Sequence, residues 1–106
     1  MKAVLQDSQH RLFLSPITIW ETLLLAEKKR IALSKPPLEW VREALAKSPV
    51  QEAPLTHEIA IKSRAIRLPH EDPADRFIAA TALEYEFTLI TEDSYLKQSV
   101  QISIFR

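Results

Sequence analysis

The sequence contains no glycine and no cysteine among its 106 residues. Without glycine it lacks the glycine-rich loops that cradle phosphates in P-loop and dinucleotide-binding proteins. Without cysteine it has neither disulfide bonds nor thiolate metal sites. No apolar run approaches the ~20 residues that a membrane-spanning helix needs, and no hydrophobic signal region follows Met1. We therefore expect a cytoplasmic protein that uses neither a membrane nor a nucleotide cradle.

The chain also lacks an excess of either charge. Fourteen basic residues balance fourteen acidic ones, so the strong positive field of many nucleic-acid binders is missing. The composition, 46% hydrophobic and 26% charged, is that of a globular protein, and we expect residues 1–106 to form a single domain. One local basic cluster stands out, namely Lys28, Lys29, Arg30 and Lys35. It is either a solvated helix end or a contact for a phosphate backbone.

Helical and extended patterns alternate along the chain. Helices are predicted from Ser15-Pro16 to about residue 29, from Pro36-Pro37 to Pro49, over 56–66 and from Asp72-Pro73 to residue 85. Strands are predicted over 11–14, 50–55, 88–91 and 101–105, and residues 2–6 resemble the last turn of a helix. This order predicts an α/β fold with a parallel sheet, in which ligands bind beyond the carboxyl ends of the strands.

Carboxylates gather at the ends of the predicted apolar elements. Asp72 suits a helix N-cap, and Asp75 in the first turn of the same helix fits either a dipole interaction or metal chemistry. Asp93 follows a short strand, and Glu21 lies within an apolar helical segment, at a boundary or partly buried. Two negative charges ~4 Å apart repel by roughly 4 kcal/mol at an effective dielectric of about 20. A divalent-metal site is therefore the leading hypothesis.

Four segments together resemble the PIN-domain family, and most closely its VapC-type toxins. One of them is residues 54–60, PLTHEIA, which resemble the joint between a strand and the third helix of the family pattern. Residues 14–21, LSPITIWE, resemble the family's strand followed by S-x-x-(S/T)-x-W-E. Residues 70–82, HEDPADRFIAATA, resemble H-x-D-P-x-D-R-x-x-x-A-x-A, and residues 89–93, LITED, resemble L-(I/V)-T-x-D. The resemblance covers almost the whole chain, and it implies a three-layer α/β/α fold.

The resemblance also implies an activity and a site. Members of the family are Mg²⁺- or Mn²⁺-dependent endoribonucleases, toxins that pair with a cognate antitoxin and commonly form homodimers. By this resemblance Glu21, Asp75 and Asp93 are the catalytic acids. Asp75 and Asp93 would be the main metal ligands, and Glu21 would bind the metal directly or through water. Asp72 would be auxiliary, and Thr91 would orient one of these groups.

One element of the family pattern is absent. The family begins with a central strand that carries the first active-site aspartate, whereas residues 1–6 align with a later helix and Asp7 falls in a turn. We expect an N-terminally truncated PIN-like domain without its central strand, and weak or absent nuclease activity. A late gene start, a natural truncation and completion by a partner remain open. The alternative function is a non-catalytic module that binds an antitoxin or a second subunit.

Overall fold

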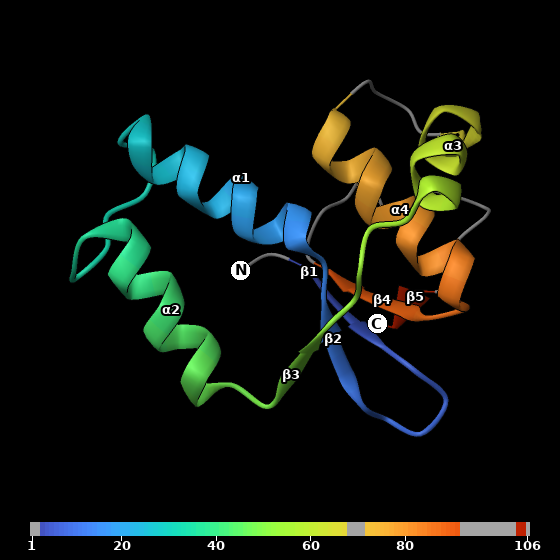
Figure 1. Cartoon of the computed structure of the whole chain (residues 1–106), viewed down its shortest axis with the longest axis horizontal. Coiled ribbons are helices and arrows are strands. Elements are labelled where there is room, and N and C mark those ends of the chain that lie inside the picture. The colour runs from blue at the N-terminus through green and yellow to red at the C-terminus, as the bar shows by residue number, and fades with distance from the viewer. Residues whose placement is uncertain (1–2, 68–71, 92–103, 106) are drawn as a thin grey trace.

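The computed structural model describes residues 3–67, 72–91 and 104–105 of the chain. Within these ranges, an initial strand pair is followed by two helices, one strand, two more helices and two further strands (Figure 1). The strands are β1 (Ala3–Gln6), β2 (Leu12–Leu14), β3 (Val50–Glu52), β4 (Thr88–Thr91) and β5 (Ile104–Phe105). The helices are α1 (Pro16–Glu27), α2 (Pro37–Lys47), α3 (His57–Ala65) and α4 (Pro73–Tyr85). The predicted α/β class is confirmed, and each predicted helix or strand from residue 11 to 91 is present in shortened or equal form.

The five strands form one sheet in the order β3-β2-β1-β4-β5. Strands β2 and β3 are parallel, as are β4 and β5, but β1 is antiparallel to both of its neighbours. The sheet is therefore mixed, and the prediction of a wholly parallel sheet is wrong at its centre. Because β2 and β4 both oppose β1, they run in the same direction. Their carboxyl ends consequently lie at the same edge of the sheet.

The central position of the sheet is filled by a segment that was predicted to be helical. Residues 3–6 form β1, with Ala3 opposite Thr91 and Leu5 opposite Leu89. Ala3 and Leu5 face the core, while the alternate residues Val4 and Gln6 are less buried. The prediction of a helix end was wrong because a short apolar segment takes its structure from its neighbours, here two strands with free edges. The predicted vacancy at the sheet centre is therefore not found.

Local capping explains where three of the helices begin. The side chain of Ser15 accepts a hydrogen bond from the Ile17 backbone at 3.1 Å at the start of α1. Thr56 caps α3 in the same way, accepting from Ile59 at 3.2 Å. Asp72 caps α4, and proline occupies the first turn of α1, α2 and α4, as its fixed backbone angle favours. These caps were readable in the sequence.

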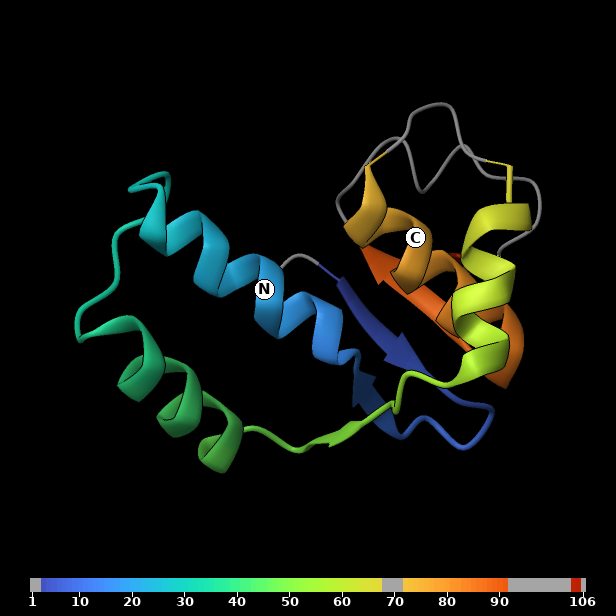
Figure 2. The same cartoon turned by 45° about the horizontal axis from the view of Figure 1, so that its top comes forward.

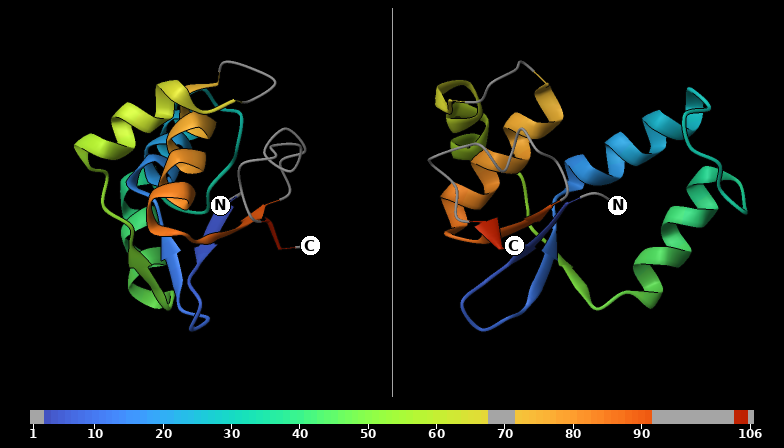
Figure 3. Two further views of the ribbon diagram at one scale, coloured as in Figure 1. Left: turned by 90° about the vertical axis from the view of Figure 1, so that its right-hand side faces the viewer. Right: turned by 180° about the vertical axis from the view of Figure 1, so that it is seen from behind.

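The core lies between the sheet and α4, which is buried along most of its length. Apolar side chains of β1 and β4 meet Ile78, Ala79 and Ala82 of α4 there. The helices contact one another in the series α3, α4, α1, α2. Helices α3 and α4 lie over the sheet, whereas α1 and α2 extend to the side of the sheet that β3 borders (Figure 2, Figure 3). The three-layer arrangement of the family stays a prediction.

A membrane segment is not among the described residues, because none of their helices is both long and apolar enough to cross a bilayer.

Candidate metal centre

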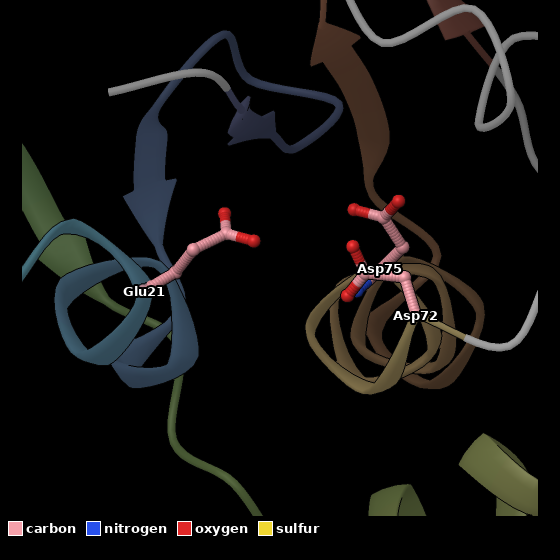
Figure 4. A group of neighbouring side chains, drawn as sticks. All are labelled: Glu21, Asp72 and Asp75. Carbon is pink, nitrogen blue, oxygen red and sulfur yellow. The ribbon is translucent and has the colours of Figure 1, made fainter. Parts of the chain in front are cut away.

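Three carboxylates from two helices converge beside the sheet. Glu21 of α1, Asp72 at the cap of α4 and Asp75 in its first turn each offer an oxygen, and these oxygens lie within 4.8 Å of one another. Figure 4 shows the Glu21 side chain extending from α1 toward the two aspartates on α4. Asp75 is 5% exposed, whereas Glu21 and Asp72 keep more contact with solvent. We call Glu21, Asp72 and Asp75 the acid cluster.

The start of α4 fixes two members of the acid cluster. Asp72 Oδ1 accepts hydrogen bonds from the backbone of Ala74 at 2.9 Å and of Asp75 at 3.4 Å. This N-cap holds the first turn in place and points its amides toward negative charge. Asp72 was predicted as a cap and as an auxiliary group of the site. It is a cap, and it also offers an oxygen to the acid cluster, as Glu21 and Asp75 do.

Helix α1 carries Glu21 on the side that faces α4. Its buried residues Thr18 and Thr22 flank Glu21 along the helix, and the Thr22 hydroxyl donates to the Thr18 carbonyl at 2.9 Å. Helices α1 and α4 pack against each other in this region. Glu21 is only partly buried, which agrees with the boundary position that the sequence allowed. Residues about 50 positions apart in the sequence therefore meet through helix packing.

A buried arginine anchors the helix that carries the aspartates. Arg76 is 7% exposed, and its Nη1 atom donates to the carbonyls of Ser63 and Ile66, both at 3.0 Å. These carbonyls lie at the end of α3, where helical carbonyls lack partners within the helix. Arg76 thus joins α3 to α4 one residue after Asp75. Sequence reasoning assigned it no role, although it stands in the D-P-x-D-R segment that signalled the site.

The remaining predicted site residues are Thr91 and Asp93. Thr91 is the last residue of β4, and its backbone pairs with Ala3 at the edge where the carboxyl ends of β2 and β4 lie. Asp93, predicted as a main metal ligand, lies outside the described residues. Its role and that of the Thr91 side chain stay predictions. His70 also lies outside, while His10 and His57 are exposed, as expected of surface residues.

A fourth aspartate, Asp7, lies at the opposite edge of the sheet. It follows β1 and accepts hydrogen bonds from Arg11, 2.8 Å from the backbone nitrogen and 2.6 Å from Nε, and from the Gln9 backbone at 3.0 Å. Removal from water opposes ionisation, but these bonds outweigh it and lower the pKa of Asp7 below its ordinary value of 3.8. Asp7 is thus a turn residue and, as expected, no substitute for an acid of the site.

The donors of the acid cluster fit a hard divalent cation. Carboxylate oxygens are the ligands that Mg²⁺ prefers, and Mn²⁺ accepts the same set. Two like charges 4.8 Å apart repel by about 3.5 kcal/mol at an effective dielectric of 20. A cation held between two helices would remove that repulsion. The arrangement could therefore bind a metal and, through it, a phosphate group.

Comparison with known proteins identifies the class to which this fold and site belong. Residues 2–99 match the PIN domain, so the chain belongs to the PIN-domain family. The resemblance seen in its motifs is thereby confirmed.

Among curated proteins, the chain is similar to Ribonuclease VapC22 of Mycobacterium tuberculosis (strain ATCC 25618 / H37Rv). The two are 38% identical over 89 residues, which cover 81% of this chain and 65% of that relative. The chain therefore matches just under two thirds of the relative's length. No solved structure matches the chain significantly.

Proposed function

We propose that the chain is a metal-dependent endoribonuclease and the toxin component of a VapBC-type toxin–antitoxin pair. The observation that carries the proposal is the convergence of Glu21, Asp72 and Asp75 within 4.8 Å from two separate helices. Membership of the PIN-domain family and similarity to a VapC ribonuclease support it. The substrate is RNA, cut where a single-stranded or looped segment exposes its phosphates.

The residues of the acid cluster would hold Mg²⁺ or Mn²⁺. Asp75 is the most buried ligand and the most rigidly placed, because it lies in the first turn of α4. Glu21 would complete the site from α1, and Asp93, which follows β4 by two residues in the sequence, is proposed as a further ligand. When bound, a divalent cation acidifies water and neutralises charge on a phosphate that is being cleaved. Asp72 contributes charge while it keeps the amides of α4 ordered.

We expect this activity to be weak. In the family pattern the first acid of the site comes from the central strand. Here the central strand β1 has the sequence AVLQ, which carries no carboxylate, and Asp7 lies at the far edge of the sheet with Arg11. A site with one charge fewer binds a divalent cation less tightly, because each carboxylate adds Coulomb attraction.

The proposed partners are a cognate antitoxin, the RNA substrate and a second copy of the chain in a homodimer. A second candidate function is a non-catalytic module that binds an antitoxin or a second subunit. Trp20 is 52% exposed on α1 and Leu38 is 59% exposed on α2, and a bound partner would remove these apolar side chains from water. In that case Asp72 and Asp75 serve only as helix caps.

Metal and substrate assays separate the two functions. Isothermal titration of the metal-free chain with Mn²⁺ should show saturable binding, and Mn²⁺ should permit slow cleavage of a labelled single-stranded RNA. Excess EDTA should abolish cleavage while circular dichroism shows that the fold persists. A chain that binds no Mn²⁺ and cuts no RNA under these conditions would support the interaction module instead.

A further inference from the structure

We propose that the C-terminal end of α1 binds the phosphate backbone of single-stranded RNA and fixes the strand beside the acid cluster. The residues are Lys28, Lys29 and Arg30, which we call the basic tract. The inference deepens the proposed nuclease function and rests on it, because it assigns the surface that receives the substrate. The basic tract would contact the RNA nucleotides that flank the cleaved phosphate. The acid cluster defines the position of that phosphate.

The basic tract differs from most other cations among the described residues by its lack of partners. Within the described residues, the side chains of Lys28, Lys29 and Arg30 make no hydrogen bond or ion pair. Almost every other described cation interacts with a neighbouring group, namely Arg11, Lys35, Lys47, Lys62, Arg64, Arg67 and Arg76. Arg42 on α2 is the exception. Three of the four uncompensated cations of the described chain therefore stand next to one another.

Helix geometry aligns the basic tract with the acid cluster. Lys28 follows Glu21 by seven residues, which amounts to two turns less about 20° and an advance of about 10 Å along the axis. The helix keeps its geometry to this point, since the Lys28 backbone donates to the Leu24 carbonyl at 3.0 Å. Lys28 therefore projects from the same side of α1 as Glu21, whose carboxylate points toward α4 (Figure 4).

The turn after α1 holds Lys29 and Arg30 next to Lys28 at the end of the helix. Lys29 adopts a left-handed conformation with φ of 57°, and the Arg30 backbone donates to the Leu25 carbonyl at 2.9 Å. This is the Schellman arrangement that ends many helices. It reverses the chain within one turn, so that three consecutive cations remain exposed at the tip of α1. A solvated helix end also favours cations there, because of the helix dipole.

The basic tract can offset the electrostatic repulsion between the acid cluster and RNA. The acid cluster repels RNA phosphates, and the chain as a whole has no net positive charge to offset this. At 0.1 M salt the screening length is about 10 Å, comparable to the axial separation of Lys28 from Glu21. The tract can therefore attract phosphates that flank the cleaved one. Glu27 is the neighbouring acid, and its removal should strengthen this attraction.

The test measures RNA binding and its salt dependence. A labelled single-stranded RNA of mixed sequence is titrated with the Asp75→Asn chain, which prevents cleavage, over a series of KCl concentrations. Replacing all three cations by glutamine should reduce the slope of log affinity against log salt by about 2, because each phosphate contact to a single strand contributes about 0.7. If the triple variant and its parent bind RNA equally near 1 M salt, the triple variant should bind about 100-fold more weakly than the parent at 0.1 M salt.

Two matched variants complete the design. Arg42→Gln removes the fourth uncompensated cation found in the described ranges and should leave the slope unchanged, while Glu27→Gln should tighten binding. Circular dichroism checks that each variant is folded. An unchanged slope in the triple variant, or no RNA binding by the parent chain, overturns the proposal. RNA binding through the tract without cleavage by the unmodified chain supports the proposal and overturns the nuclease function. If the unmodified chain cleaves RNA and the triple substitution leaves cleavage unchanged, the nuclease function is supported and the role of the basic tract is overturned.

Discussion

Aspartates at the two edges of the sheet have opposite electrostatic surroundings. At one edge, Asp7 is satisfied by Arg11 and Gln9 within the same turn. At the other, Asp72 and Asp75 are brought together with Glu21 from a different helix. The first arrangement balances its charge among residues close in sequence. The second gathers like charges from distant elements, which raises the electrostatic energy of the fold.

This contrast separates an acid with a structural role from candidate metal ligands. An acid whose partners are local neighbours stabilises a turn. Acids that tertiary packing brings together, with one of them buried, favour a bound cation. Substitutions at each edge of the sheet should test this contrast.

The largest effect is expected from the same isosteric change made at each edge. Asp75→Asn removes a charge from the acid cluster and should weaken Mn²⁺ binding by at least about 100-fold, since loss even of outer-shell groups costs 10–100-fold. Asp7→Asn should leave the Mn²⁺ affinity unchanged. Isothermal titration measures both variants. Equal losses of affinity would mean that the two edges do not differ as described.

A substitution at Arg76 should remove the hydrogen bonds that join α3 to the helix carrying Asp72 and Asp75. Arg76→Met keeps much of the side-chain length but leaves the Ser63 and Ile66 carbonyls without this donor. We expect the free energy of unfolding to fall by about 2 kcal/mol, as for the loss of a buried charged hydrogen bond. The matched change Arg42→Met should cost less than about 0.5 kcal/mol, because Arg42 makes no comparable contacts. Urea denaturation compares the two variants.

Asp72 separates capping from metal binding. Asp72→Ala removes both the cap and the charge, and it should lower the free energy of unfolding by about 1 kcal/mol. Asp72→Asn keeps a good cap, so stability should hardly change. Both variants should weaken Mn²⁺ binding to a similar degree if the carboxylate is a ligand. Normal Mn²⁺ affinity in Asp72→Asn would reduce Asp72 to a cap.

The smallest effect is expected from acid titration of Asp7. Its pKa is lowered on folding, so the folded chain binds fewer protons there and stability rises with pH through this range. The contribution is complete above the ordinary pKa of 3.8 and is lost as the pH falls below it. Thermal melts from neutral to acidic pH should show a slightly steeper loss in the parent chain than in Asp7→Asn. A steeper loss in the variant would contradict the assigned sign.

Much of the fold could be predicted because its boundaries are set by local chemistry. Ser15-Pro16, Thr56 and Asp72-Pro73 start helices through caps that any sequence reader can recognise, and the structure begins its helices there. The error at residues 3–6 has a different origin. A segment of four residues carries too little periodicity to separate helix from strand, and its pairing with β4 is a contact between distant parts of the chain.

The candidate site was predictable in part for the same reason. The sequence pattern at the start of α4 identifies Asp72 and Asp75 as candidates. Glu21 reaches them only because α1 packs on α4. The anchoring role of Arg76 depends on carbonyls at the end of α3, which no local pattern reveals. Asp93 and the Thr91 side chain remain predictions from the family pattern.

The antiparallel central strand has a consequence for the order of assembly during synthesis. Strand β1 can pair with β2 as soon as both have left the ribosome, but its other partner, β4, is made only after α4. Contacts between segments far apart in the chain form late, because a long loop must first be closed. The part of the acid cluster on α1 therefore waits for the part on α4, and the cluster can assemble only after residue 75 has been synthesised.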